Sequence, residues 1–179
     1  MTNKKNLEKV FQNHGYSDYR WINPKDIVVS HWVRNKCRYG CPTYGTKGAC
    51  PPNNPPISEC RDFFKEYSTA AVFHFEKSFR DPKDRHKWTN RINLKLLKLE
   101  RDIFLSGYYK TFLFFMDECS LCTKCTGTRL ECKNKESSRP TPEGFGVDVF
   151  ATVRSIGYPI EVLKDHKQKM NRYAFLMID

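Results

Sequence analysis

Four cysteines lie within fifteen residues in the second half of the chain, in the stretch ECSLCTKCTGTRLEC at residues 118–132. They are spaced C-x2-C-x2-C-x6-C and are Cys119, Cys122, Cys125 and Cys132. Three thiolates at two-residue gaps can each reach a different iron of one cubane cluster, and bacterial ferredoxins use these first three spacings. Structural zinc sites more often pair two C-x2-C knuckles, and the last two cysteines of this group do not form a second knuckle. The spacing therefore favours a [4Fe–4S] cluster, with zinc as the alternative metal.

A second group of four cysteines lies nearer the N-terminus, in a loop rich in glycine and proline. It has the looser spacing C-x3-C-x8-C-x9-C and consists of Cys37, Cys41, Cys50 and Cys60. The glycines of this loop allow tight turns and can present N–H groups to cluster sulfurs. Cys60 has two interpretations, either as the fourth metal ligand or as a small core residue, since free cysteines are often buried. If Cys60 is not a ligand, one metal position stays open, and we expect this group to form the reactive site.

The N-terminal segment MTNKKNLEKV is polar and lacks the apolar stretch of a signal peptide. The longest apolar run, at residues 112–116, is far too short to cross a membrane. We therefore expect a cytoplasmic protein with no membrane association. In that compartment thiols stay reduced, so clustered cysteines hold metal more often than they form disulfides.

The chain carries a formal net charge of +11, from 31 lysines and arginines against 20 aspartates and glutamates. Basic residues are concentrated at 83–101. Such an excess favours an acidic partner. We expect an acidic redox protein or a small anionic ligand, with nucleic acid as the less favoured alternative, and the sequence does not define an oligomeric state.

The hydrophobic pattern predicts an α/β fold, a mixed sheet with flanking helices, in a single metal-binding domain at residues 1–179. We expect helices at 4–13, 58–67, 85–106 and 141–155. We expect strands at 27–32, 70–75, 109–116, 158–162 and 173–178. Each half then reads strand, cysteine loop, helix, strand, which indicates a weak internal repeat of 27–76 and 110–163. Such a repeat would place both cysteine loops at strand ends, where α/β folds usually carry their sites.

Three stretches of the chain, taken in order, are KCRYGCPTYGTKGACPP, LERDIFLSGYYKTFLFFMDECSLCTKC and RPTPEGFGVDVFATVRSIG. Their combination resembles the DUF2284 family of predicted metal-binding proteins, which is found widely in anaerobic bacteria and archaea. The resemblance covers about residues 30–160 and implies a cysteine-ligated metal, with iron–sulfur expected, but no settled reaction. The resemblance implies that seven cysteines correspond to the family pattern: Cys37, Cys41, Cys50, Cys119, Cys122, Cys125 and Cys132. The GFGVDVF stretch departs mildly from the family pattern and includes no proposed ligand.

Two functions stay open at this point. The first is an iron–sulfur protein with one or two [4Fe–4S] clusters, acting in electron transfer or in a redox reaction of anaerobic metabolism. Such a chain is either an iron–sulfur oxidoreductase or its electron-transfer component. The second is a zinc-binding module for nucleic acid or protein partners. A phosphate-binding loop, a nucleophile elbow and a zinc-protease helix motif are all missing from the sequence.

Overall fold

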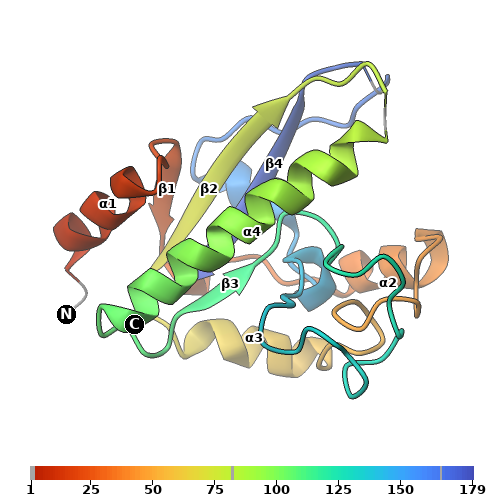
Figure 1. Cartoon of the computed structure of the whole chain (residues 1–179), viewed down its shortest axis with the longest axis horizontal. Helices are drawn as coiled ribbons and strands as arrows, with labels where there is room; N and C mark the ends of the chain where they lie inside the picture. Colours follow the sequence, from red (N-terminus) through yellow and green to blue (C-terminus); the bar gives the residue numbers. More distant parts are fainter. Residues whose placement is uncertain (1–2, 82, 166) are drawn as a thin grey trace.

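The computed structural model describes residues 3–81, 83–165 and 167–179. In this part of the chain one sheet is built from β1 (Tyr19–Ile22), β2 (Ala70–Lys77), β3 (Phe112–Phe114) and β4 (Met170–Met177). The strands lie in the order β1-β2-β4-β3 (Figure 1), and every neighbouring pair is antiparallel. The predicted α/β class with flanking helices is confirmed, and the described sheet is antiparallel throughout rather than mixed.

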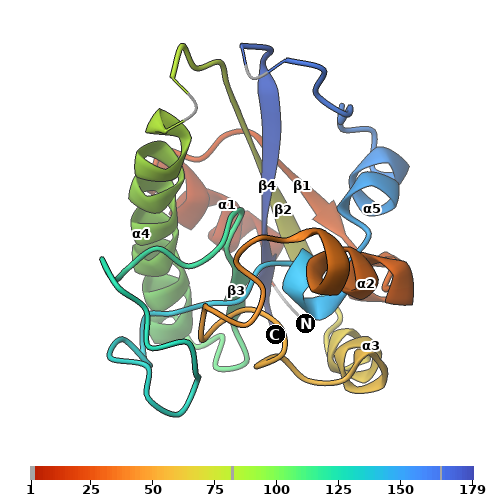
Figure 2. The same cartoon turned by 90° about the vertical axis from the view of Figure 1, so that its right-hand side faces the viewer.

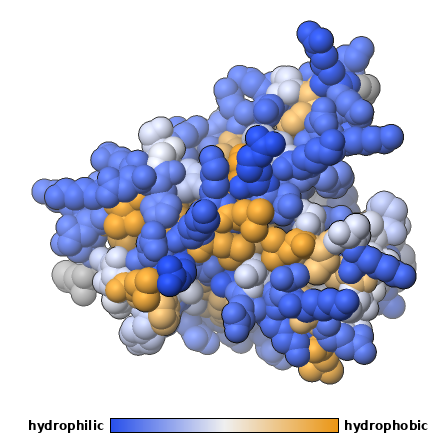
Figure 3. All heavy atoms as spheres, in the orientation of Figure 1, coloured by the Kyte–Doolittle hydropathy of each residue, from blue (hydrophilic) through white to orange (hydrophobic). Residues whose placement is uncertain are grey.

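The sheet lies between two layers of helices (Figure 2). One face is covered by α1 (Lys4–Asn13) and α4 (Asp84–Leu105), and the other by α2 (His31–Gly40), α3 (Ile57–Lys65) and α5 (Val149–Ser155). Coverage on both faces explains why the central strands contain continuous apolar runs, at 70–73 in β2 and 173–177 in β4. The face of the molecule in front of α4 is mainly hydrophilic, with apolar side chains across its middle (Figure 3).

Two apolar cores result from the alternation of side chains along the strands. In β2, Ala71 and Phe73 pack with Leu96 and other residues of α1 and α4. Val72, between them, packs with Phe64 and other residues of the opposite helix layer. Both cores therefore depend on the register of β2 against β4, which pairs Ala70 with Met177 and Lys77 with Met170.

Most of the expected long elements are confirmed. The helices expected at 4–13, 58–67 and 85–106 correspond to α1, α3 and α4. The strands expected at 70–75 and 173–178 correspond to β2 and β4, and the strand expected at 109–116 is shortened to β3.

The strand expected at 27–32 is wrong. Helix α2 begins at His31, and before it only Val29 makes an isolated bridge, to Val147. The apolar run IVVSHW is short, and a short run of this kind does not distinguish a strand from the start of a helix. Because this strand is missing, the expected internal repeat is not confirmed, and the first cysteine loop follows a helix.

The helix expected at 141–155 is divided into two. A 3-10 helix, η2 (Glu143–Phe145), ends at Gly146, whose φ of 78° is left-handed and closes the turn. Helix α5 then starts anew, because the Asp148 side chain accepts a hydrogen bond from the Ala151 N–H at 2.9 Å. The strand expected at 158–162 does not form, and this described segment instead packs Tyr158 and Ile160 into the core.

A helix of the length and apolarity that crossing a bilayer requires is not found among the described residues.

Replacing Tyr16 by phenylalanine should stabilise the protein. The Tyr16 ring packs 5.3 Å from the Phe73 ring, and its enclosed hydroxyl has no hydrogen-bond partner among the described residues. Removing this hydroxyl should raise the free energy of unfolding by about 1 kcal/mol at neutral pH. Urea denaturation of both proteins measures the difference.

The advantage of Tyr16→Phe should widen in alkali. Burial raises the pKa of Tyr16 from 10.0 to about 12, so the folded state opposes ionisation of the phenol. The free energy of unfolding of the native protein is therefore unaffected by this group below pH 10. As the pH rises through 12 it falls by about 1 kcal/mol, after allowance for solvent screening, whereas Tyr16→Phe has no phenol to ionise. The exposed Tyr109→Phe is the control, and an equal change in both variants would contradict this explanation.

Candidate metal centre

Three cysteines of the first group surround one small cavity. Cys37 lies on α2, and Cys41 follows the helix, donating its N–H to the Cys37 carbonyl at 3.3 Å. Successive turns then bring Cys50 back, with its N–H bonded to the Lys47 carbonyl at 3.1 Å. The three cysteines line a cavity of about 170 Å³ together with Glu118 and other residues.

The sulfurs of these three cysteines influence one another. Burial raises the pKa of the Cys50 thiol to about 12, and the Glu118 carboxylate adds to the effect. The thiols of Cys37 and Cys41 also contribute to it. A site of this kind opposes several free thiolates at once, and bound metal removes the opposition by neutralising their charge.

Cys60 lies apart from this cavity. It is on α3, in the first turn of the helix as expected, and is completely buried in the core beside Phe64. Its thiol donates to the Pro55 carbonyl at 3.4 Å, and an Arg34 Nη2 lies 3.8 Å from its sulfur. Of the first group, the structure therefore brings Cys37, Cys41 and Cys50 together and leaves Cys60 in the core, where its thiol contacts Arg34 and the Pro55 carbonyl.

The loop with the second cysteine group leaves the sheet at the end of β3. After Phe114 the chain departs from β4, and the Phe115 N–H bonds to the Pro140 carbonyl at 2.9 Å. This bond joins the two ends of the loop. Like the Leu113 N–H, which bonds Glu100, the Phe115 N–H points away from β4, so it is free to hold the end of the loop beside the sheet.

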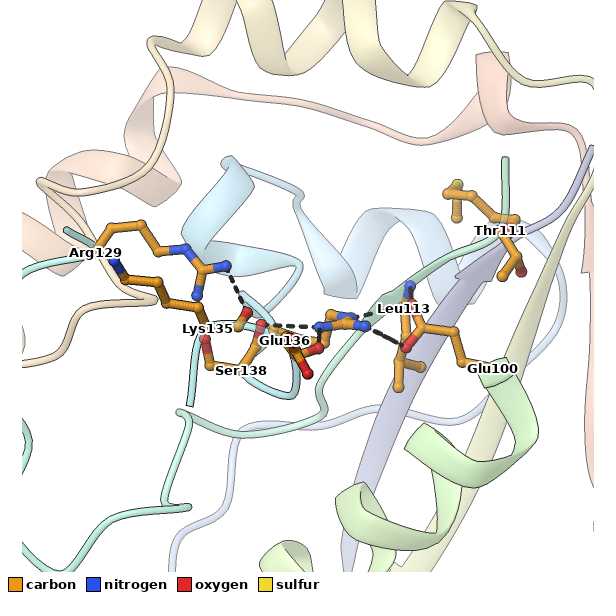
Figure 4. Close-up of polar contacts among 9 residues, drawn as sticks. Glu100, Thr111, Leu113, Arg129, Lys135, Glu136 and Ser138 are labelled. Carbon is orange, nitrogen blue, oxygen red and sulfur yellow. Dashed lines mark hydrogen bonds and ion pairs between the residues drawn. The ribbon is translucent and has the colours of Figure 1, made fainter. Parts of the chain in front are cut away.

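Two arginines fasten the same loop (Figure 4). Arg139 forms an ion pair with the buried Glu100 of α4, with 2.9 Å between Nη2 and Oε2. Glu100 also accepts the Leu113 N–H of β3 at 2.8 Å, so one carboxylate links helix, strand and loop. Arg129 bonds the Lys135 carbonyl at 2.7 Å and also the Ser138 hydroxyl.

The four cysteines of the second group are neighbours. Burial raises the pKa of Cys119, and the charges of the other three thiols add to it. Polar groups of the chain contact their sulfurs: the Asn134 amide donates to Cys122 Sγ at 3.0 Å, and the Gly48 N–H donates to Cys125 Sγ at 3.4 Å. Donors of this kind are typical of cysteines that ligate metal, because they stabilise the thiolate.

Cys125 shows the effect most clearly. Burial alone would raise its pKa, but the N–H groups of Gly127, Gly48 and Thr126, together with the charge of Lys47, outweigh burial and lower it. The thiolate is the form that ligates metal. Two of these contributors, Gly48 and Lys47, belong to the first cysteine loop, so one loop stabilises the thiolate of a cysteine on the other.

The two cysteine loops are joined directly. The Asn53 side chain donates to the Gly127 carbonyl at 2.9 Å and accepts the Arg129 N–H at 3.3 Å. Glu118 accepts the Thr43 hydroxyl at 2.8 Å and lies 3.6 Å from the Lys47 ammonium. Figures 1 and 2 both show the loops side by side at one end of the sheet.

A larger cavity, of about 530 Å³, adjoins the first cysteine group. It shares Cys37, Cys41 and Glu143 with the small cavity and extends from there toward β4. Among the described residues no three His, Cys, Asp or Glu side chains lie close enough as they stand to ligate a single ion. What the structure presents is two sets of neighbouring thiols on interlocked loops.

A family model described as a predicted metal-binding protein, DUF2284, matches residues 20–178. The chain belongs to this family. The DUF2284 match spans both cysteine loops, β2, β3, β4 and all of β1 except Tyr19, and it confirms the expectation of a metal-binding protein. No curated protein and no solved structure matches the chain.

Several residues of this DUF2284 protein that shape the centre were not expected from the sequence. They are Asn53 of the first loop, Glu118 and Asn134 of the second, and Arg172 of β4. Gly48 differs from them, because the glycines of the first loop were expected to present N–H groups to sulfurs, and the Gly48 N–H bonds Cys125 Sγ at 3.4 Å. Arg172 had a readable signal, since it is a charged residue in the otherwise largely apolar segment MNRYAFLMI. The loop residues had none, because their partners lie in a distant part of the sequence.

Serine substitutions should show whether Cys60 differs from the other cysteines in its effect on metal content. Cys60→Ser should keep the metal content of the native chain, because Cys60 is packed in the core, and should cost about 1 kcal/mol of stability. Cys132→Ser should lower the metal content, because Cys132 belongs to the neighbouring thiols of the second group. Metal analysis of the anaerobically purified variants measures both. Equal loss of metal in the two variants would show that Cys60 is a ligand.

A methyl group at Gly48 should separate the two loops. A Cβ there would lie 2.6 Å from the Thr128 carbonyl oxygen, which is backbone and cannot move aside easily. Gly48→Ala should therefore reduce metal content and lower the free energy of unfolding by about 2 kcal/mol. Gly40→Ala is the matched control at the end of α2, since its Cβ would meet nothing within 4 Å. If both variants behave like the native protein, the close approach of the loops does not hold the centre.

Proposed function

We propose that this protein is an iron–sulfur protein that holds two [4Fe–4S] clusters and acts in electron transfer or in a redox reaction. The observation that carries the proposal is the pair of interlocked thiol sets, in which the chain's own N–H donors contact sulfurs. One cluster is assigned to Cys119, Cys122, Cys125 and Cys132. The other is assigned to Cys37, Cys41 and Cys50, with Cys60 taken as a core residue.

The residues present suit such a cluster. The donor set consists of thiols, and C-x2-C-x2-C is a cluster spacing rather than a paired zinc knuckle. The Gly48 N–H and the Asn134 amide contact Cys125 and Cys122, as the donors around cluster sulfurs commonly do. When bound, two such clusters would supply one-electron transfer between neighbouring sites.

Cys50 and Cys119 connect the two sets. They belong to different loops, yet the charge of Cys119 contributes to the raised pKa of Cys50. Their proximity supports a shared redox role for the two sets. Asn53, which bonds both loops, keeps this relation in place.

We further propose that the chain works in the cytoplasm with an acidic redox protein. Helix α2, which carries Cys37, contains no acidic residue. Its exposed side chains include Trp32 and Tyr39, with the cations of Lys36 and Arg38 over their respective rings. A basic and aromatic surface beside the first set suits an acidic protein that exchanges electrons there.

Anaerobic purification followed by iron, acid-labile sulfide and zinc analysis tests the proposal. We expect a coloured protein with about eight iron and about eight sulfide per chain, as two cubane clusters require. Cys119→Ser should lower the iron to about half, because it disturbs one set only. A colourless protein that contains zinc and no labile sulfide would instead establish the zinc-binding alternative.

A further inference from the structure

The larger cavity is formed where β4 loses its neighbour. Strand β3 pairs only with Phe175 to Met177, so the first half of β4 has an open edge among the described strands. The cavity of about 530 Å³ lies between this part of β4, helix α2 and the start of α5, and it ends at Cys37 and Cys41. A volume of this size accommodates a small organic molecule.

The walls of this cavity are largely apolar. Trp32 of α2 and Phe150 of α5 line it, with Val147 and Ile160 between them. Trp32 is 47% exposed, so its large ring has apolar surface available to a ligand. Such walls favour a ligand with an aromatic or branched apolar body.

One wall carries a guanidinium that lacks an adequate partner. The Arg172 Nε is enclosed, yet it has no hydrogen-bond acceptor among the described residues. Its nearest carboxylate, Asp117, is 3.9 Å away and is shared with Arg85 at 3.4 Å. Two guanidinium groups thus share one carboxylate at long distance, and not all donors of Arg172 are satisfied.

Lys36 adds a second cation to the lining. Its ammonium lies 5.4 Å over the Trp32 ring and forms no ion pair with the described part of the chain. Lys36 is therefore available to an anion, and Arg172 has only the long ion pair that it shares with Arg85 at Asp117. A carboxylate is the group that a guanidinium binds best, because it accepts two parallel N–H bonds.

Two carboxylates also line the cavity, and the chain's own groups engage them. Asp148 accepts the Ala151 N–H at 2.9 Å as the cap of α5. Burial raises the pKa of Glu143, and the charge of Arg172 and the Thr141 side chain act against it. Asp148 thus has a donor within the protein and Glu143 is within reach of the Arg172 charge, whereas the Arg172 Nε has no hydrogen-bond acceptor among the described residues.

We propose that this cavity binds a small carboxylic acid with an apolar body, whose carboxylate pairs with Arg172 and is attracted by Lys36. The apolar body lies between Trp32 and Phe150 and extends toward Cys37. The prediction that the acid binds depends only on the cavity and its residues. Its role as the substrate of the first metal site rests on the proposed function.

Calorimetric titration of the native protein with benzoate tests this site, with sodium chloride at equal ionic strength as the salt control. We expect saturable binding of benzoate. Acetate lacks the apolar body and benzyl alcohol lacks the charge, so each should bind about tenfold more weakly or worse. Failure of benzoate to bind, or equal binding of benzyl alcohol, would overturn the proposal.

Variants locate the carboxylate. Arg172→Gln should weaken benzoate binding about tenfold or more, and Lys36→Gln about threefold. Arg38→Gln is the matched control, because it removes the same charge from the same helix at a residue that does not line the cavity; it should change binding by less than about twofold. Thermal unfolding of each variant verifies that it is folded. Native affinity in Arg172→Gln, or equal losses in Lys36→Gln and Arg38→Gln, would contradict the assignment.

The two proposals fail separately. A chain that contains iron and sulfide but does not bind benzoate contradicts this inference alone. A chain that binds benzoate but contains no labile sulfide contradicts the iron–sulfur proposal and leaves the carboxylate site in place.

Discussion

The centre depends on the contact between two polar loops, because neither loop contains enough apolar surface to order itself. Asn53 provides the central part of that contact by bonding Gly127 and Arg129 of the opposite loop. Gly48 allows the backbones to approach, and its N–H reaches Cys125. The same junction supplies a hydrogen bond that stabilises a thiolate, so the contact that orders the loops also favours the charged form of Cys125.

The early end of β3 has two effects on the same region. When the chain leaves β4 after Phe114, it starts the second cysteine loop and exposes the edge of β4 at Arg172. The buried Glu100 controls this departure, since it holds the Leu113 N–H on one side and Arg139 on the other. A carboxylate in the core is costly unless it is fully bonded, and here its bonds position the loop.

The features that could be predicted are those whose signal lies in residues close together in the sequence. The spacing of Cys119, Cys122 and Cys125 indicated a metal site, and the long periodic pattern of 85–106 indicated α4. Helix α2 was missed because its start, at His31, follows a short apolar run that suits a strand equally well. The division between η2 and α5 depends on the backbone of Gly146, which the pattern of apolar residues does not reveal.

The loop junction could not be predicted for a different reason. Asn53 and Gly127 are 74 residues apart, and nothing in the residues beside either of them indicates the other. The sequence likewise left Cys60 open between a metal ligand and a core residue, and only the tertiary fold places its side chain beside Phe64. Spacing describes which sulfurs are close along the chain, whereas the tertiary fold decides which are close in space.

The distance in sequence between Gly48 and Cys125, 77 residues, has a consequence for biosynthesis. During translation the first cysteine loop emerges well before the loop that holds it in place. Until the ribosome has released the second loop, Cys37, Cys41 and Cys50 belong to an unsupported segment whose thiols are open to oxidation. Maturation of the centre is therefore a late event in the life of the nascent chain, and the cell must keep the early thiols reduced until the second half of the protein has been made.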